Sequence, residues 1–223
     1  MDRLLTPTLY ASRSFAVSSL GAPDGSRTIP LTERRALSDS HEIEKRVIET
    51  LGGIGVPYEL VQIDPAYADT AAFCEKYGFP PERSGNTIIV GSKKEPRQFS
   101  ACLVLATSKL DVNHAVRDLM GVSRLSFATA DDTTALTGML IGGVTVFALP
   151  PELPIYVDEK VMALDWVILG SGSRSSKIKT SPEALRRLPN ARVVPALTLG
   201  ASSSEERVGV PARHAQQDRS RRA

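Results

Sequence analysis

The chain has 223 residues, of which 27 are Lys or Arg and 25 are Asp or Glu, so its formal net charge at neutral pH is +2. This length suits one domain with additional segments, and a hydrophobic content of 42% is enough for one core. No stretch approaches the roughly 18 consecutive apolar residues of a membrane-spanning helix. The small net charge argues against a polycation that binds nucleic acid through many phosphate contacts.

The two cysteines, Cys74 and Cys102, are too few for a disulfide framework. The chain also has no Cys-x-x-Cys pair and no Cys/His cluster of the kind that predicts a zinc site. We therefore expect a cytoplasmic protein with no metal and no other cofactor.

The positive charge belongs to the two ends of the chain. Residues 1–40 contain sixteen Ser, Thr, Pro or Gly and no apolar period, which predicts a flexible leader. A targeting peptide is the alternative, but no apolar segment follows a basic start. Residues 196–223, with five arginines and three acidic residues, predict a disordered basic tail, and the domain between the ends, 41–195, has 17 basic and 18 acidic residues.

Apolar residues at helical spacing predict a first helix over 42–51, capped by Asp39 and Glu42 and ended by Gly52. The pattern then predicts, in chain order, a strand at 58–63, a helix at 70–77, two hairpin strands at 87–90 and 99–106, a helix over 111–121 and a strand at 124–127.

The second half of the domain begins with a short helix at 131–136 and a glycine-rich segment at 138–146. Strands at 155–157 and 166–169, a Gly/Ser loop at 170–174 and a helix from 181 follow. Because helices and strands mix without strict alternation, we expect a single α/β domain with a mixed, curved, largely antiparallel sheet flanked by helices.

The two glycine-rich segments are the best candidates for contact with a ligand, because glycine lets the backbone approach closely and expose its N–H groups. Gly142 and Gly143 could equally form a bend that enters a strand. Gly170 and Gly172 resemble part of a dinucleotide-binding fingerprint, but the third glycine is absent and the helix follows too late. None of the three histidines is placed for a nucleophilic triad.

Taken together, five segments resemble one family. They are Asn-Thr-Ile-Ile-Val at 86–90, Leu-Thr-Gly at 136–138, Gly-Gly-Val-Thr-Val-Phe at 142–147, Leu-Pro-Ile-Tyr-Val-Asp at 153–158 and Gly-Ser-Gly-Ser-Arg at 170–174. Their order and spacing are similar to those of the YbaK-like aminoacyl-tRNA editing domains, which also occur as an insertion in bacterial prolyl-tRNA synthetases. The resemblance runs from about residue 41 to residue 194.

The resemblance implies a trans-acting deacylase that hydrolyses the ester of mischarged tRNA, with the acceptor end of aminoacyl-tRNA and a synthetase as partners. It assigns catalytic roles to Asn86, at the family's lysine position, and to the backbone of Gly142 and Gly143. The substrate-binding residues that it implies are Thr87, Gly138, Thr145, Asp158, Gly170, Gly172, Arg174 and Lys177. The phosphates near the acceptor end would meet Arg174 and Lys177, with Lys93 or Lys94.

Two positions depart from the family pattern. Typical active members have a lysine where this chain has Asn86, and many have a proline where it has Val146. Asparagine can hydrogen-bond a carbonyl but brings no positive charge. Two functions therefore stay open: a deacylase, and a non-catalytic module that binds aminoacyl-tRNA or a synthetase.

Overall fold

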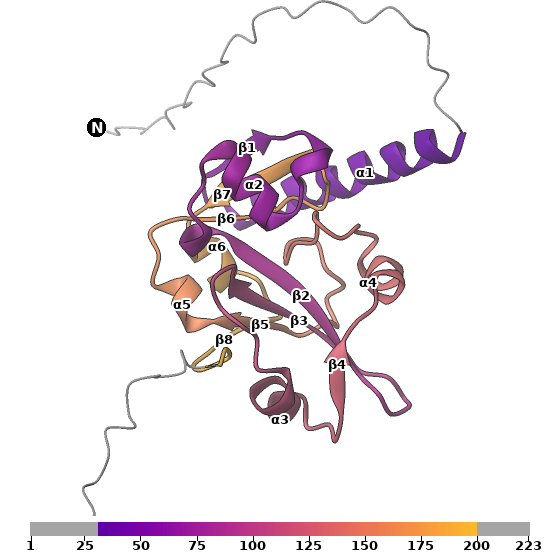
Figure 1. Cartoon of the computed structure of the whole chain (residues 1–223), viewed down its shortest axis with the longest axis vertical. Coiled ribbons are helices and arrows are strands. Elements are labelled where there is room, and N and C mark those ends of the chain that lie inside the picture. Colours follow the sequence, from indigo (N-terminus) through magenta and orange to yellow (C-terminus); the bar gives the residue numbers. More distant parts are fainter. Residues whose placement is uncertain (1–30, 200–223) are drawn as a thin grey trace, which may run out of the picture.

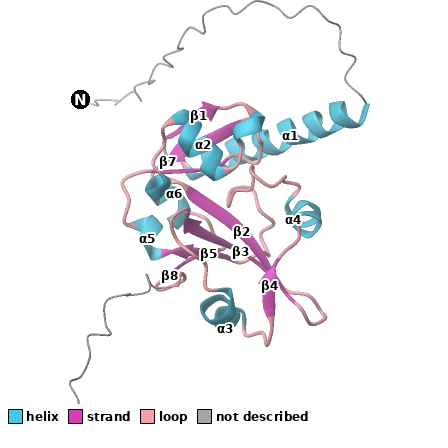
Figure 2. Ribbon diagram, viewed as in Figure 1, coloured by secondary structure: helices cyan, strands magenta, loops and turns pink. Residues whose placement is uncertain are grey.

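The computed structural model describes residues 31–199, and its strands form two sheets (Figures 1 and 2). The smaller, antiparallel sheet has the order β1 (Tyr58–Gln62), β7 (Ser176–Thr180), β6 (Val167–Gly170). The larger sheet has the order β4 (Leu125–Phe127), β2 (Gly85–Ser92), β3 (Phe99–Leu105), β5 (Ile155–Asp158), β8 (Ala191–Val194).

The larger sheet is mixed. Strand β2 pairs antiparallel with β3 and with β4, whereas β5 runs parallel to β3 and to β8. A bridge between Ser84 and Ile168 connects the beginning of β2 to the smaller sheet. The mixed, largely antiparallel α/β fold is thus confirmed, with its strands divided between two sheets.

Helices lie around both sheets (Figure 2). They are α1 (Leu31–Ile54), α2 (Thr70–Tyr77), α3 (Arg117–Met120), α4 (Ala130–Thr137), α5 (Glu159–Met162) and α6 (Glu183–Arg186), with 3₁₀ turns η1 (Pro65–Tyr67) and η2 (Pro81–Arg83) and a π-helical turn η3 (Val112–Val116). Figure 1 shows α1 and α2 beside the smaller sheet and α3 at the opposite end of the molecule. Within 31–199, no helix is long and apolar enough to cross a membrane.

Both faces of β3 are buried. Leu103 belongs to the main apolar core, together with Val47 of α1 and Ile178 of β7, whereas Cys102 and Val104 belong to a second cluster on the other face. Successive side chains of a strand point to opposite faces, so β3 separates the two clusters. Burial raises the pKa of the Cys102 thiol to about 12, which agrees with its assignment to the core.

The structure differs from the predicted elements at both ends of the described residues. The first helix begins at Leu31, not at residue 42, so 31–40 are helical and Asp39 lies inside the helix. Good helix formers among these residues, such as Ala36 and Leu37, outweigh the Ser and Thr content that indicated a leader. The predictions for 1–30 and 200–223 lie outside the described residues.

Residues 196–199, assigned to the tail, pack against the domain. Leu197 is fully buried in the second apolar cluster, and its carbonyl accepts a hydrogen bond from the Asp111 N–H at 3.1 Å. The Leu199 N–H donates to the Lys109 carbonyl at 2.8 Å. The composition of 196–223 as a whole did not indicate this short apolar stretch.

Strands β7 and β8 are not among the predicted elements. In β7 two lysines alternate with Ser and Ile, and lysine is depleted in strands. No strand follows Gly142 and Gly143, since 144–149 have turn and irregular backbone even though Val146 and Phe147 are buried. Tertiary contacts decide both features.

Because Leu197 is buried and its neighbour Leu199 is half-exposed, the two residues make a matched test of the packed C-terminal segment. We expect Leu197→Ala to lower the free energy of unfolding by about 2–4 kcal/mol, as for other buried leucines. Leu199→Ala should change it by less than about 0.5 kcal/mol. Urea unfolding of both variants measures the difference, and equal values would place residue 197 outside the core.

Candidate functional site

A cavity of about 280 Å³ lies beside β2 and opens to solvent. Five of the residues that the sequence predicted for the site line it: Asn86, Thr87, Gly142, Gly170 and Lys177. They come from β2, β6, β7 and the turn after α4, so the fold brings together segments that are far apart in the chain.

The cavity exposes backbone atoms of β2. The Ile89 carbonyl accepts a hydrogen bond from the Ala128 N–H at 2.9 Å, just beyond β4, and Gly91 pairs with Ser126. Because backbone groups of a strand alternate between its two edges, Thr87 also directs its N–H and carbonyl to this edge. Strand β4 ends before it reaches Thr87, so these groups face the cavity. The Thr87 hydroxyl is buried and has no partner within the described residues.

Asn86 stands between this cavity and a second one. Its side-chain oxygen accepts a hydrogen bond from the Thr70 hydroxyl at 2.6 Å, which fixes the orientation of the amide. Both residues also line the neighbouring cavity, of about 530 Å³, whose other wall includes Cys74 and Phe79. The amide nitrogen of Asn86 is therefore the group left to donate to a ligand.

Lys177 places a positive charge in the cavity wall. Its side chain is only 6% exposed, and its ammonium donates to the Ala68 carbonyl at 2.7 Å and to the Gly142 carbonyl at 2.8 Å. The ammonium also lies 5.6 Å from the centre of the Phe73 ring. An ammonium has three hydrogens, and two are held by these carbonyls, so the third is available to a bound group.

Burial lowers the pKa of Lys177 to about 8, and the nearby Arg174 guanidinium contributes in the same direction. Asp69 acts in the opposite direction. Since the pKa stays above 7, the ammonium is mainly charged at neutral pH. Because the ammonium is buried in the cavity wall, a group has to enter the cavity to reach it, and its contact with a phosphate near the acceptor end stays a prediction.

Arg174 makes several contacts within the protein. Its guanidinium donates to the carbonyls of Ile141 and, at 3.0 Å, Pro65, and it lies 3.5 Å from the Asp69 carboxylate. These contacts connect the turn around Gly142 to the segment before α2. Arg174 therefore positions the cavity wall.

Gly142 has the left-handed φ of +90° that favours glycine, and an added Cβ would collide with the Arg174 guanidinium. Its N–H has no partner in the described part of the chain. Gly143 differs, because its N–H donates to the Leu140 carbonyl at 2.9 Å and it does not line the cavity. Of the two predicted backbone donors, only Gly142 is placed to meet a ligand.

The two glycine segments pack directly on each other. The Gly143 carbonyl accepts from the Gly172 N–H at 2.8 Å. A Cβ on Gly143 would lie 2.8 Å from the Ser173 carbonyl, and one on Gly170 would collide with the Val144 carbonyl. Close backbone approach, which only glycine permits, therefore forms this wall of the cavity.

Besides Gly143 and Arg174, four predicted site residues lie outside the cavity lining. Gly138 ends α4 with a φ of +76°, and Gly172 packs against Ile43. Thr145 is fully buried, with a hydroxyl that has no partner among the described residues. Asp158 is also buried and caps α5 by accepting from the Lys160 N–H at 2.8 Å. Gly138, Gly172 and Asp158 therefore have structural roles in these positions.

Sequence reasoning missed three contributors: Thr70, which orients Asn86; Ala68, whose carbonyl binds Lys177; and Phe127, at the cavity mouth. The first two act through contacts between distant segments, for which the chain carries no local signal. An aromatic residue at the end of a predicted short strand is the one signal that could have indicated Phe127. Among residues 31–199, no group of three or more His, Cys, Asp or Glu is arranged to hold a metal ion.

Comparison with known proteins agrees with this architecture. Residues 64–188 match the family model described as the aminoacyl-tRNA editing domain. The crystal structure of the hypothetical protein APE2540 is similar, with a TM-score of 0.62 and 24% identity over 69% of this chain and 99% of that one. A candidate trans-editing enzyme for prolyl-tRNA synthetase has a TM-score of 0.61 and 23% identity over 71% of this chain and 98% of its own. At these identities the two structures show a shared fold.

The buried charge of Lys177 makes stability depend on pH. The pKa is about 8 in the folded protein against 10.5 for an ordinary lysine, so the unfolded chain binds more protons between these values. Stability should therefore rise across this window, by about 2 kcal/mol between pH 7 and pH 10 relative to Lys177→Met. Denaturant unfolding of both proteins measures this. Lys179→Met, on the same strand, should keep the rise; a flat difference between wild type and Lys177→Met contradicts the buried charge.

The close approach at Gly170 predicts that Gly170→Ala displaces the turn that carries Gly142. The new Cβ meets the backbone carbonyls of residues 143 and 144 rather than a flexible side chain, so we expect a loss of about 1–3 kcal/mol in unfolding free energy. Gly52→Ala in α1 is the control, since no atom lies within 4 Å of its Cβ, and it should stabilise by about 0.5–1 kcal/mol. Thermal unfolding of both variants measures these opposite changes in stability.

Proposed function

Because the chain belongs to the aminoacyl-tRNA editing domain family, we propose that it acts in trans as a deacylase that hydrolyses the ester between tRNA and a wrongly attached amino acid. The observation that supports this most directly is the convergence of Asn86, Thr87, Gly142 and Lys177 on one open cavity. The similarity over nearly the whole length of the candidate trans-editing enzyme supports action in trans.

The proposed reaction needs water and no further reactant. The oxygen of a water molecule adds to the ester carbonyl carbon, and negative charge develops on the carbonyl oxygen. The bond between this carbon and the ribose oxygen then breaks. One proton of the water is transferred to the ribose oxygen, so the products are a free amino acid and uncharged tRNA.

The cavity supplies donors where this charge would develop. The N–H groups of Gly142 and Thr87 and the amide nitrogen of Asn86 are neutral donors on its wall. Backbone donors of this kind are each worth about 2.7–4 kcal/mol in a water-excluding site. Lys177 adds a positive charge from behind Gly142, because its ammonium binds the carbonyl of that residue at 2.8 Å.

The size of the cavity favours small aminoacyl groups. Its volume of about 280 Å³ lies just below the ~300–1,000 Å³ that is usual for small-molecule sites. The terminal adenosine would therefore remain at the mouth while the ester and a small side chain enter. Alanine, serine, threonine, cysteine and proline are the candidates to test.

A non-catalytic binding module is the second candidate function. The observation that favours it is the residue at 86, where active relatives have a lysine and this chain has an uncharged amide held by Thr70. The same cavity would then recognise aminoacyl-tRNA or a synthetase without hydrolysis. Both candidates share a binding site, and they differ in turnover.

We expect the protein to release at least one amino acid of this panel from its tRNA faster than buffer does. Asn86→Ala and Gly142→Val should each lower the rate by about 100-fold, as for other losses of a transition-state donor. Asn86→Ala also removes the wall between the two cavities, so loss of discrimination among amino acids should accompany the loss of rate. Release of radiolabelled amino acid measures both.

Arg192→Gln, on the exposed part of β8, is the matched control and should keep the wild-type rate. Binding of the charged tRNAs without release of any amino acid would overturn the deacylase and favour the binding module. Asn86→Lys then tests whether this position alone prevents turnover. Unchanged rates in both Asn86→Ala and Gly142→Val would contradict the proposed site.

A further inference from the structure

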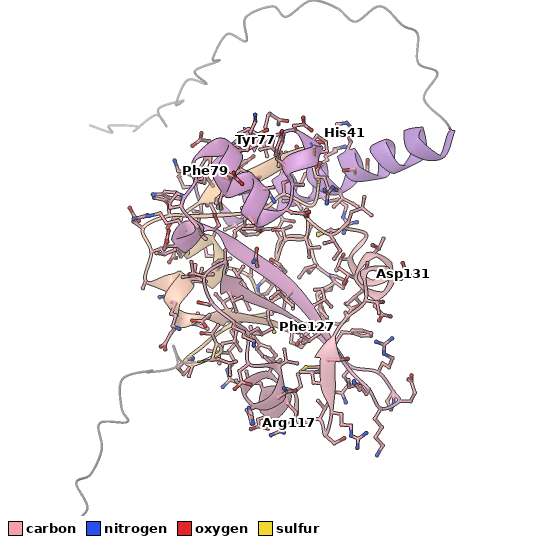
Figure 3. The ribbon with its side chains drawn as sticks, in the orientation of Figure 1. His41, Tyr77, Phe79, Arg117, Phe127 and Asp131 are labelled. Carbon is pink, nitrogen blue, oxygen red and sulfur yellow. The ribbon has the colours of Figure 1, made fainter. Side chains whose placement is uncertain are left out.

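Exposed apolar side chains surround the mouth of the cavity. Phe127 at the end of β4 is 59% exposed and lines the cavity, as does Ile141 in the turn before Gly142. Figure 3 shows Phe127 where β4 meets β2, with α4 and Asp131 to one side of it. An aromatic ring so exposed beside a polar cavity contributes little to the core, and none of the apolar clusters of the described chain includes it.

Positive charges follow Phe127 along the edge of the larger sheet. Lys93 and Lys94, in the hairpin between β2 and β3, and Arg124, at the start of β4, are exposed and have no carboxylate within 4 Å among the described residues. The Lys93 N–H donates to the Arg124 carbonyl at 3.2 Å, which holds the hairpin beside β4. At about 3.3 Å per residue, Arg124 lies about 10 Å from Phe127.

Two of these three cations border a hollow. A depression of about 370 Å³ between the hairpin and the loop before β4 is lined by Lys94 and Arg124, together with Glu95. The carboxylate of Glu95 accepts a hydrogen bond from the Arg97 N–H at 3.0 Å. The Arg97 guanidinium is bound to Asp132 of α4 at 2.8 Å, so it is not part of the unpaired group.

The other sides of the mouth carry acidic groups. Asp69 is exposed and lies 3.5 Å from the Arg174 guanidinium, and Asp131 is exposed on α4. An anionic chain that leaves the cavity therefore meets unpaired positive charge along β4, an Asp69–Arg174 ion pair before α2 and an exposed carboxylate on α4. Charge complementarity selects the β4 side as its path.

We propose that Phe127 is a stacking platform for the terminal base of the tRNA 3′ end, and that Lys93, Lys94 and Arg124 bind the phosphates of the single strand that follows. This inference rests on the proposed function, because that function supplies the tRNA ester in the cavity. An aromatic side chain followed by unpaired cations is the arrangement by which proteins bind single-stranded nucleic acid. The platform also explains how a cavity of about 280 Å³ can act on a tRNA: only the aminoacyl group enters.

Uncharged tRNA tests the platform independently of hydrolysis. We expect Phe127→Ala to weaken the binding of intact tRNA about tenfold, and to leave unchanged the binding of the same tRNA without its terminal adenosine. Phe127→Trp should retain the wild-type affinity, and Phe127→Leu should bind as weakly as Phe127→Ala. If one variant fails to fold, the other variants still test the platform. Tyr58→Ala, which removes a 38% exposed ring from β1, is the control.

The salt dependence of binding tests the cations. Substitution of Lys93, Lys94 and Arg124 by glutamine should reduce the slope of log K against log salt. The expected reduction is about 0.7 for each phosphate of the single strand that is no longer neutralised, or about 2 in the triple variant. Arg192→Gln should leave the slope unchanged. Fluorescence anisotropy with labelled tRNA over a range of salt concentrations measures both quantities.

Equal affinity of wild type and Phe127→Ala for intact tRNA, an unchanged slope in the triple variant, or no binding of uncharged tRNA by the wild type would each overturn the proposal. Failure of the proposed deacylase gives a different result. If the protein binds tRNA through Phe127 and releases no amino acid, only the proposed hydrolysis is contradicted. If the protein hydrolyses the ester and Phe127→Ala changes neither the binding nor the rate, only the stacking platform is contradicted.

Discussion

The buried ammonium of Lys177 is the interaction on which the rest of the site depends. It lies between the carbonyls of Ala68 and Gly142 and so joins β7, the segment before α2 and the glycine turn. An ionised amine is costly to bury unless it is hydrogen-bonded, and the two carbonyls together with the face of Phe73 offset that cost. The Gly172 N–H, which donates to the Gly143 carbonyl at 2.8 Å, and the Arg174 guanidinium, which donates to the Ile141 carbonyl, hold the same turn.

This arrangement gives a physical meaning to the asparagine at position 86. The editing-domain resemblance leads to the expectation of a cation on β2, and here a neutral amide, oriented by Thr70, takes that place. A cation enters the same cavity from β7 instead. In the proposed deacylase, the positive charge of Lys177 acts through the Gly142 turn from one wall, and the neutral amide of Asn86 donates from another.

Glycine has two different uses at the site. At Gly142 it permits a left-handed backbone whose N–H has no described partner, whereas at Gly143 and Gly170 it permits two chain segments to touch at distances that no Cβ allows. The first use can serve a ligand, and the second builds the wall. The same residue type in the same motif thus leaves a backbone donor for a ligand at one position and permits close packing at the next.

Local patterns in the sequence were sufficient to predict the α/β class, most of the helices and strands, and the two glycine segments, because periodicity, caps and glycine conformations are properties of neighbouring residues. The site residues came instead from the family resemblance, and five of them, Asn86, Thr87, Gly142, Gly170 and Lys177, line one cavity. Only the tertiary structure decided that β7 is a strand, that Leu197 and Lys177 are buried and that Thr70 orients Asn86. These features depend on contacts between groups from distant parts of the chain. Patterns among neighbouring residues do not predict such contacts.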